Sequence, residues 1–131
     1  MNRGWLHFLP VALYMGFIFY LSSHAAPGFL VCIPTVFGIK VTHVGEYAIM
    51  ALLTMYGLAR GTRGPRRRAY VVAVVVTVAY GISDEYHQSF VAGRTAAAVD
   101  VLSDLLGGLS AVAAHAYASA RGWLGTLVFR A

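Results

Sequence analysis

The chain has 131 residues, of which 59% are hydrophobic and only 11% are charged, and its formal net charge is +5. Soluble proteins carry about 25% charged residues, and a soluble domain of this length has no interior large enough to hide so much apolar surface. The composition therefore excludes an ordinary soluble domain and predicts a membrane protein. The single cysteine, Cys32, excludes an intramolecular disulfide, and we expect it to be a small buried or interfacial residue.

The first apolar segment runs from Trp5 to Leu21. Arg3 precedes it and small residues follow it, which is also the pattern of a secretion signal, but its apolar stretch is longer than the ~7 to 15 residues of such signals. We therefore expect a retained membrane anchor. The loop that follows, LSSHAAPGFLVCIPTVFGIK, is long and unusually apolar. We expect it to dip into the membrane or to lie across its surface as a lid.

Three further apolar segments follow, at Val41 to Ala59, Ala69 to Gln88 and Val99 to Ala120. Each approaches the ~20 residues that a helix needs to cross the hydrocarbon core of a bilayer. The segment that begins at Ala69 is informative, because its purely apolar part ends at Ile82 and is too short to cross alone. It must take the polar residues DEYHQ into its last turns. Gly, Ala and Ser in the last segment predict close packing inside a bundle.

The arginines predict the orientation of these four spans. The stretch RGTRGPRRR between the second and third spans holds five of the ten basic residues, and short loops rich in Lys and Arg remain in the cytoplasm. Both termini then lie inside as well, and Lys40 and Arg94 are the two basic residues outside. The sequence thus predicts one all-α domain over residues 1–131 with four transmembrane helices, cytoplasmic termini and a long apolar first outer loop. The basic stretch needs no nucleic acid as a partner, although anionic lipid could bind it.

All five acidic residues fall at the outer ends of helices in this topology, and two histidines join them. In chain order they are His43, Glu46, Asp84, Glu85, His87, Asp100 and Asp104. Residues three and four apart share one face of a helix, so three helices each present a polar stripe at one depth. A charged side chain deep in lipid costs roughly 2.5 to 3.5 kcal/mol, so we expect the stripes to face one another. Glu85 is turned by about 100° from Asp84, which leaves its direction open.

Five carboxylates face two outer cations, Lys40 and Arg94, so three charges remain unbalanced if all the carboxyls ionise. Protonated histidines, a bound divalent cation (zinc, manganese or magnesium), or carboxyls that stay protonated would each reduce this excess. The candidate metal ligands are His43, Glu46, His87 and Asp104. A single polar residue in a span most often only fastens helices together. Seven ionisable residues at one depth favour a functional site over that purely structural role.

Three stretches resemble a known family. They are LSSHAAP after the first span, KVTHVGEYAIMALL at the start of the second, and DEYHQSFVAGRTAAAVDVLSDLLG between the third and the fourth. They are similar to the VanZ-like membrane proteins, a family named for a glycopeptide-resistance gene product associated with teicoplanin. The resemblance covers about Leu21 to Gly107 and implies a bacterial cell-envelope setting. Carried onto this chain, the polar signature of the family is His43, Tyr47, Asp84, Glu85, His87, Gln88, Arg94 and Asp100.

Two functions of different class fit these residues. The first is a membrane-embedded hydrolase or transferase that acts, by metal assistance or by acid and base chemistry, on a lipid-linked envelope molecule at the outer face of the cytoplasmic membrane. Its catalytic groups would be Asp84, Glu85, His87 and Asp100. Its substrate contacts would be Lys40, Tyr47, Gln88 and Arg94. The chain has no G-x-S-x-G motif, which disfavours a serine nucleophile.

The second function is a non-catalytic binder, or a proton-coupled translocator, of a lipid head group or a glycopeptide-type antibiotic. The same polar residues would grip the ligand without making or breaking a bond. A lone four-helix unit has little room for a complete transport path, and the chain shows no internal repeat of the kind found in many transporters. Transport would therefore require a homo-oligomer.

Overall fold

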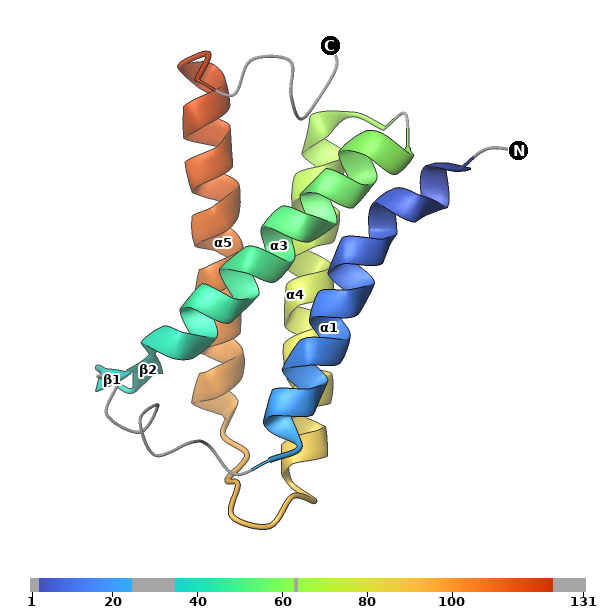
Figure 1. Cartoon of the computed structure of the whole chain (residues 1–131). Coiled ribbons are helices and arrows are strands. Elements are labelled where there is room, and N and C mark those ends of the chain that lie inside the picture. Colours follow the sequence, from blue (N-terminus) through green and yellow to red (C-terminus); the bar gives the residue numbers. More distant parts are fainter. Residues whose placement is uncertain (1–2, 25–34, 63, 124–131) are drawn as a thin grey trace.

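The computed structural model of the chain describes residues 3–24, 35–62 and 64–123. Its elements, in chain order, are η1 (Arg3–Phe8), α1 (Leu9–Ser22), β1 (Thr35–Val36), β2 (Ile39–Lys40), α3 (Val41–Gly61), α4 (Arg66–Gln88) and α5 (Ala98–Ala120) (Figure 1). The four long helical segments lie where the apolar segments predicted them. Residues 25–34, which are half of the predicted lid and include Cys32, lie outside the described residues.

Helix α4 continues through DEYHQ and ends at Gln88, as its apolar length predicted. No proline or glycine follows Gly81 until Gly93, so nothing in the sequence breaks the helix before its polar end. The chain then turns, with Gly93 at a positive φ of 80°, a conformation that glycine adopts without steric cost. This turn returns the chain to the start of α5, so the ends of the two helices that carry most of the acidic residues lie at the same level.

A short β-hairpin precedes α3. Thr35 pairs with Lys40 and Val36 with Ile39 in an antiparallel register. The two residues between the strands, Phe37 and Gly38, both have positive φ, at 51° and 81°, which is the geometry of a type I′ turn. The hairpin was not predicted by the sequence, which indicated only a loop here, and it fixes Lys40 directly before the first turn of α3.

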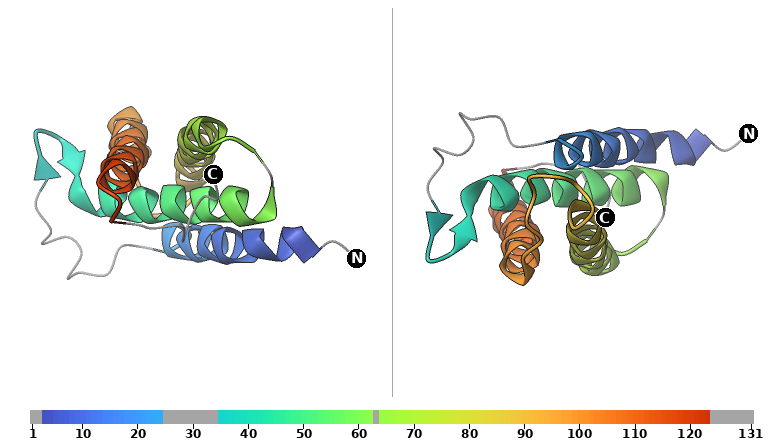
Figure 2. Two further views of the ribbon diagram at one scale, coloured as in Figure 1. Left: turned by 90° about the horizontal axis from the view of Figure 1, so that it is seen from above. Right: turned by 90° about the horizontal axis from the view of Figure 1, so that it is seen from below.

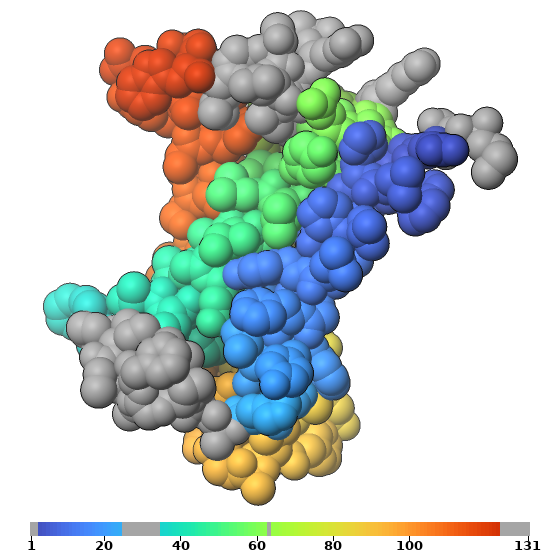
Figure 3. All heavy atoms as spheres, in the orientation of Figure 1, coloured from blue at the N-terminus to red at the C-terminus, as the bar shows by residue number. Residues whose placement is uncertain are grey.

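Two pairs of helices form two layers that cross at an angle (Figure 2). Helices α1 and α3 lie side by side in one layer, and α4 and α5 form the other. Buried Val11 and Ile18 of α1 pack against Tyr47 and Met50 of α3. Figure 3 shows α1 lying along α3 over much of its length. Because α3 also contacts α4 and α5, it is the helix that all the others share.

Glycines bring α5 close to both neighbouring helices. A Cβ atom placed on Gly107 would collide with the carbonyl oxygen of Val44 in α3. One placed on Gly108 would lie 3.1 Å from Cγ2 of Thr77 in α4. The small residues of the last helix therefore pack inside the bundle, as predicted, and they let α5 approach the backbone of α3.

Among the described residues, three helical segments are long and apolar enough to cross a membrane. They are Arg3–Ser22, with 20 residues, and Arg66–Gln88 and Ala98–Ala120, with 23 each. Their outer surfaces expose large apolar side chains, such as Leu13, Val75 and Leu106, which suits contact with lipid. Helix α3 has 21 residues but is not among the three, so length and composition alone do not establish a fourth span.

The polar and basic ends of the bundle are opposite. Helices α1 and α4 end where α3 and α5 begin, and at that end lie the acidic residues. At the other end Arg66, Arg67 and Arg68 are exposed at the start of α4. Helix η1 begins, and α5 ends, toward this basic end (Figure 1). The separation of charge along the bundle agrees with the pattern predicted from the sequence.

Candidate functional site

His43 and Asp104 form a buried pair of an imidazole and a carboxylate at the polar end of the bundle. Nδ1 of His43, in the first turn of α3, lies 2.9 Å from Oδ1 of Asp104 in α5. The His43 side chain is 11% exposed and that of Asp104 only 1%. The Asp104 carboxyl fits against α4 only because Gly81 has no side chain, since a Cβ there would collide with Oδ2 of Asp104. Three helices therefore meet at this pair.

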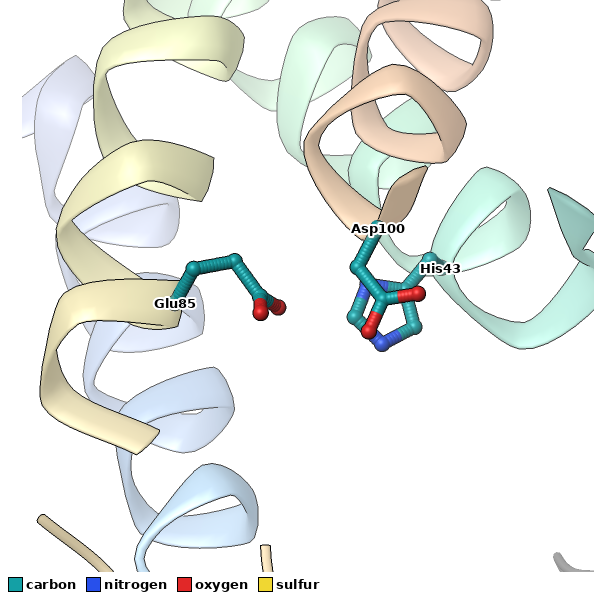
Figure 4. Close-up of side chains that lie close together, drawn as sticks. All are labelled: His43, Glu85 and Asp100. Atoms are coloured by element: carbon teal, nitrogen blue, oxygen red, sulfur yellow. The ribbon is translucent and has the colours of Figure 1, made fainter. Parts of the chain in front are cut away.

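Glu85 and Asp100 converge on the same imidazole. One ligand atom from each of His43, Glu85 and Asp100 lies within 4.8 Å of the other two, and all three residues are buried. Figure 4 shows the Glu85 side chain reaching from α4 toward Asp100 of α5 and the ring of His43 on α3. The sequence left the direction of Glu85 open, and the structure turns it toward α5.

One oxygen of each of these two carboxylates is already bound. Oε2 of Glu85 accepts a hydrogen bond from the backbone N–H of Ala97 at 2.8 Å. Oδ2 of Asp100 forms an ion pair with Nζ of Lys40 at 2.5 Å. Lys40 is in turn held in place because its backbone N–H donates to Oγ of Ser103 at 3.2 Å. Ser103 and Gly81 thus support the site, although no pattern in the sequence indicated either residue.

Five further oxygens at this end of the bundle are buried without a hydrogen-bond partner among the described residues. They are Oδ1 of Asp84, Oε1 of Glu85, Oδ1 of Asp100, Oδ2 of Asp104 and the hydroxyl of Tyr47. A buried polar atom with no partner costs about 1 to 3 kcal/mol, and more if it is charged. So many at one place indicate a site that binds a ligand, because structural polar networks are normally saturated.

Asp84 and Gln88 form a second, smaller pair on α4. Nε2 of Gln88 donates to Oδ2 of Asp84 at 2.8 Å, and both residues are buried. Glu46 is partly buried, one turn after His43 on α3. These three residues lie at the same end of the bundle as the group formed by His43, Glu85 and Asp100, but they are not members of it.

His87 and Arg94 contact α1 and the residues that follow it. Nε2 of His87 lies 2.9 Å from Oγ of Ser23, and its ring lies 4.4 Å from that of Phe19. Arg94 donates to the carbonyl oxygens of Leu21 at 2.8 Å and His24 at 3.0 Å. His87 and Arg94 thus hold the end of α1 in place. Of the four residues expected to bind metal, only His43 belongs to the group that it forms with Glu85 and Asp100.

The three-helix arrangement combines an imidazole of fixed orientation with carboxylates whose free oxygens can accept a proton or bind a cation.

A model of one protein family, described as VanZ/LLP1, matches residues 3–118. The chain belongs to the VanZ/LLP1 family. The matched segment contains α1, α3, α4, all of α5 except its last two residues, and every acidic residue of the chain. Neither the curated proteins nor the solved structures gave a match.

Membership of the VanZ/LLP1 family confirms the resemblance inferred from the sequence. With its three long apolar helical segments, this VanZ/LLP1 protein is a multi-pass membrane protein.

Proposed function

We propose that the chain crosses the bacterial cytoplasmic membrane four times, with both termini in the cytoplasm. Helices α1 and α4 run in the same direction in Figure 1. If both cross the membrane, the chain between them must return to the first side, and α3 runs antiparallel to α1 along its length. The exposed Arg66, Arg67 and Arg68 then face the cytoplasm, as short basic loops do, and the carboxylates face outward.

We further propose that the polar end of the bundle is the active centre of a hydrolase or transferase that acts on a lipid-linked molecule of the cell envelope. The observation that supports this most strongly is the His43–Asp104 pair at 2.9 Å, next to buried Glu85 and Asp100 with free oxygens. An imidazole oriented by a carboxylate, close to further proton acceptors, is a recurring arrangement in acid and base catalysis. At the outer end of the helices it would meet the head groups of lipids.

The reaction would proceed by proton transfer and substitution. Glu85 accepts a proton from water, or from the hydroxyl of an acceptor molecule if the protein is a transferase. The oxygen of that water or hydroxyl attacks a phosphorus atom or a carbonyl carbon of the substrate. The bond from that atom to the leaving oxygen breaks, and the leaving oxygen takes up the proton from Glu85. Lys40, whose side chain is 42% exposed, would contact an anionic group of the substrate.

Turnover of lipid substrates by purified protein tests this proposal. The full chain is reconstituted in nanodiscs with bacterial envelope lipids and their lipid-linked precursors, and the lipids are then analysed by mass spectrometry. Wild type should convert one class of lipid. Glu85→Gln should lower the rate by about 100-fold or more, as expected for loss of a general base, and Asp100→Asn should also lower it, because Asp100 holds Lys40, the proposed substrate contact. Tyr86→Phe is the matched control, because Tyr86 adjoins Glu85 but is 70% exposed.

The same experiment tests the alternative of a non-catalytic protein. If wild type binds a lipid head group or a glycopeptide antibiotic and leaves every lipid chemically unchanged, the enzyme proposal fails. Weaker binding by Lys40→Met would then support a binder that holds anionic ligands, because Lys40 is partly exposed beside the buried carboxylates.

A further inference from the structure

We infer that His43, Glu85 and Asp100 together bind one divalent transition-metal ion between helices α3, α4 and α5. One ligand atom from each residue lies within 4.8 Å of the other two, and the three side chains point toward a common centre (Figure 4). This inference rests on the proposed function and deepens it, because a cation at the same site would activate the attacking water in place of Glu85, which would then be one of its ligands. Binding of the ion can nevertheless be measured without any reaction.

Besides the close grouping of the three residues, two deeply buried oxygens without a hydrogen-bond partner among the described residues indicate a bound cation. Asp100 is 0% exposed and Glu85 is 6% exposed, and Oδ1 of Asp100 and Oε1 of Glu85 have no hydrogen-bond partner among the described residues. Two buried carboxylates this close together repel each other unless something positive lies between them. A divalent ion satisfies both at once.

The hydrogen bond between His43 and Asp104 prepares the imidazole as a ligand. Nδ1 lies 2.9 Å from Oδ1 of Asp104, so Nδ1 carries the proton when it donates to the carboxylate, and Nε2 keeps its lone pair. Histidines that bind metals almost always donate their other N–H to a carboxylate, carbonyl or water. Asp104 is therefore a positioning residue, and the ligand set is one imidazole nitrogen and two carboxylate oxygens.

This ligand set selects the class of ion. Calcium and magnesium prefer oxygen ligands throughout, whereas imidazole combined with carboxylates suits zinc, manganese or iron. Three protein ligands leave coordination positions for water or substrate, as in catalytic zinc sites. Zn²⁺ and Mn²⁺ are therefore the appropriate probes.

Lys40 would compete with the ion for Asp100. Its ammonium group pairs with Oδ2 of Asp100 at 2.5 Å, and its side chain is 42% exposed against 0% for Asp100. An ion bound by Oδ1 of Asp100 would repel this ammonium group, and the half-exposed side chain has room to turn toward solvent. Removal of the lysine charge should consequently tighten metal binding, whereas removal of a ligand should weaken it.

Direct binding measurements test the inference. The full chain is purified in nanodiscs, freed of any affinity tag, carries Cys32→Ala to remove thiol ligation, and is treated with a chelator. Zn²⁺ and Mn²⁺ are then titrated by calorimetry, and bound metal is quantified by mass spectrometry. We expect one equivalent of metal per chain. His43→Ala, Glu85→Gln and Asp100→Asn should each weaken binding by more than about 10-fold, and Asp104→Asn by about 10- to 100-fold.

Three variants keep the test independent of general damage to the fold. Lys40→Met should bind metal more tightly than wild type, which a partly unfolded protein would not do. His87→Ala and Glu46→Gln should change the affinity by less than about twofold, because neither residue belongs to the group of close ligand atoms. Folding of each variant is checked by circular dichroism before titration.

The possible failures are distinguishable. A folded wild type that binds no stoichiometric metal overturns the inference and leaves the proposed acid and base reaction intact. Equal losses in His87→Ala and His43→Ala also overturn it, because the site would then include His87. Stoichiometric binding with the expected variant pattern, but without turnover of any lipid, supports the metal site and refutes the proposed enzyme.

Discussion

The carboxyl of Asp104 on α5 lies directly against Gly81 on α4, so that a Cβ atom on residue 81 would collide with Oδ2. The same carboxyl holds Nδ1 of His43 at 2.9 Å. A single glycine on one helix thus lets a second helix orient the imidazole of a third. The stability of the bundle and the geometry of the site depend on the same contact.

Gly81→Ala should therefore destabilise the protein, although alanine is the better helix former. We expect a loss of about 1 to 3 kcal/mol from overpacking, measured as the melting temperature of the protein in detergent. Gly16→Ala is the control, because a Cβ on Gly16 meets nothing within 4 Å. It should be neutral or stabilise by up to about 1 kcal/mol. Equal melting temperatures for the two variants would mean that Asp104 does not lie against Gly81.

Tyr47→Phe should raise stability. The hydroxyl of Tyr47 is buried without a hydrogen-bond partner among the described residues, so its removal relieves a desolvation cost of about 1 kcal/mol. Tyr80→Phe is the matched control, because the Tyr80 hydroxyl donates to the carbonyl oxygen of Met15 at 2.6 Å, and its loss should lower stability by about 1 kcal/mol. Chemical denaturation in a fixed detergent measures both. If Tyr47→Phe destabilises as much as Tyr80→Phe, the Tyr47 hydroxyl has a partner, such as a bound ligand.

Arg94 should act mainly on the end of α1. It donates to the carbonyl oxygens of Leu21 and His24, so Arg94→Ala should speed amide hydrogen exchange around Leu21 to His24 by about 5-fold or more, the equivalent of one lost hydrogen bond. Arg94→Lys keeps the charge but not the forked geometry and should give an intermediate effect. Arg67→Ala, an exposed arginine at the opposite end, is the control. Unchanged exchange in Arg94→Ala would free Arg94 for the substrate contact expected from the sequence.

The four-span topology predicts opposite accessibility at the two ends of the bundle. Thr62 and Thr95 are both exposed, and in the proposed orientation Thr62 faces the cytoplasm and Thr95 faces outward. On a Cys32→Ala background, a membrane-impermeant maleimide should label Thr95→Cys on intact cells and label Thr62→Cys only after lysis. Labelling of both residues from outside, or of Thr62→Cys alone, would contradict the proposed topology.

The sequence predicted the positions of the helices well, because the lengths of the apolar segments define them. The charge pattern along the bundle also followed from the sequence, since acidic and basic residues gather at opposite helix ends in a chain with few charges. The extension of α4 through DEYHQ could be derived because Ala69 to Ile82 is too short to cross a bilayer.

The pairings within the site could not be derived in the same way. Spacing along a helix places Asp84 and His87 on one face, but it does not say which helix that face meets. His87 contacts Ser23 and Phe19 near α1, while Glu85, whose direction was open, points toward α5. These outcomes depend on how the two layers cross, which is determined by small residues such as Gly107 and Gly108.

The β-hairpin was missed for a local reason. Its turn residues are Phe37 and Gly38, and only the second is typical of a type I′ turn, since asparagine or aspartate normally precedes the glycine. Phe37 has a positive φ of 51°, which is uncommon for a residue other than glycine. The hairpin matters for the site because it directs Lys40 toward Asp100.

X-ray absorption spectroscopy of the zinc-loaded protein tests most directly the central claim that α3, α4 and α5 build one site. The wild-type chain should show a single imidazole nitrogen, two carboxylate oxygens and no sulfur in the coordination shell, with zinc–nitrogen and zinc–oxygen distances of about 2.0 to 2.2 Å. His87→Ala should leave that spectrum unchanged. Two imidazole ligands, a sulfur ligand, or a spectrum altered by His87→Ala would contradict the site formed by His43, Glu85 and Asp100.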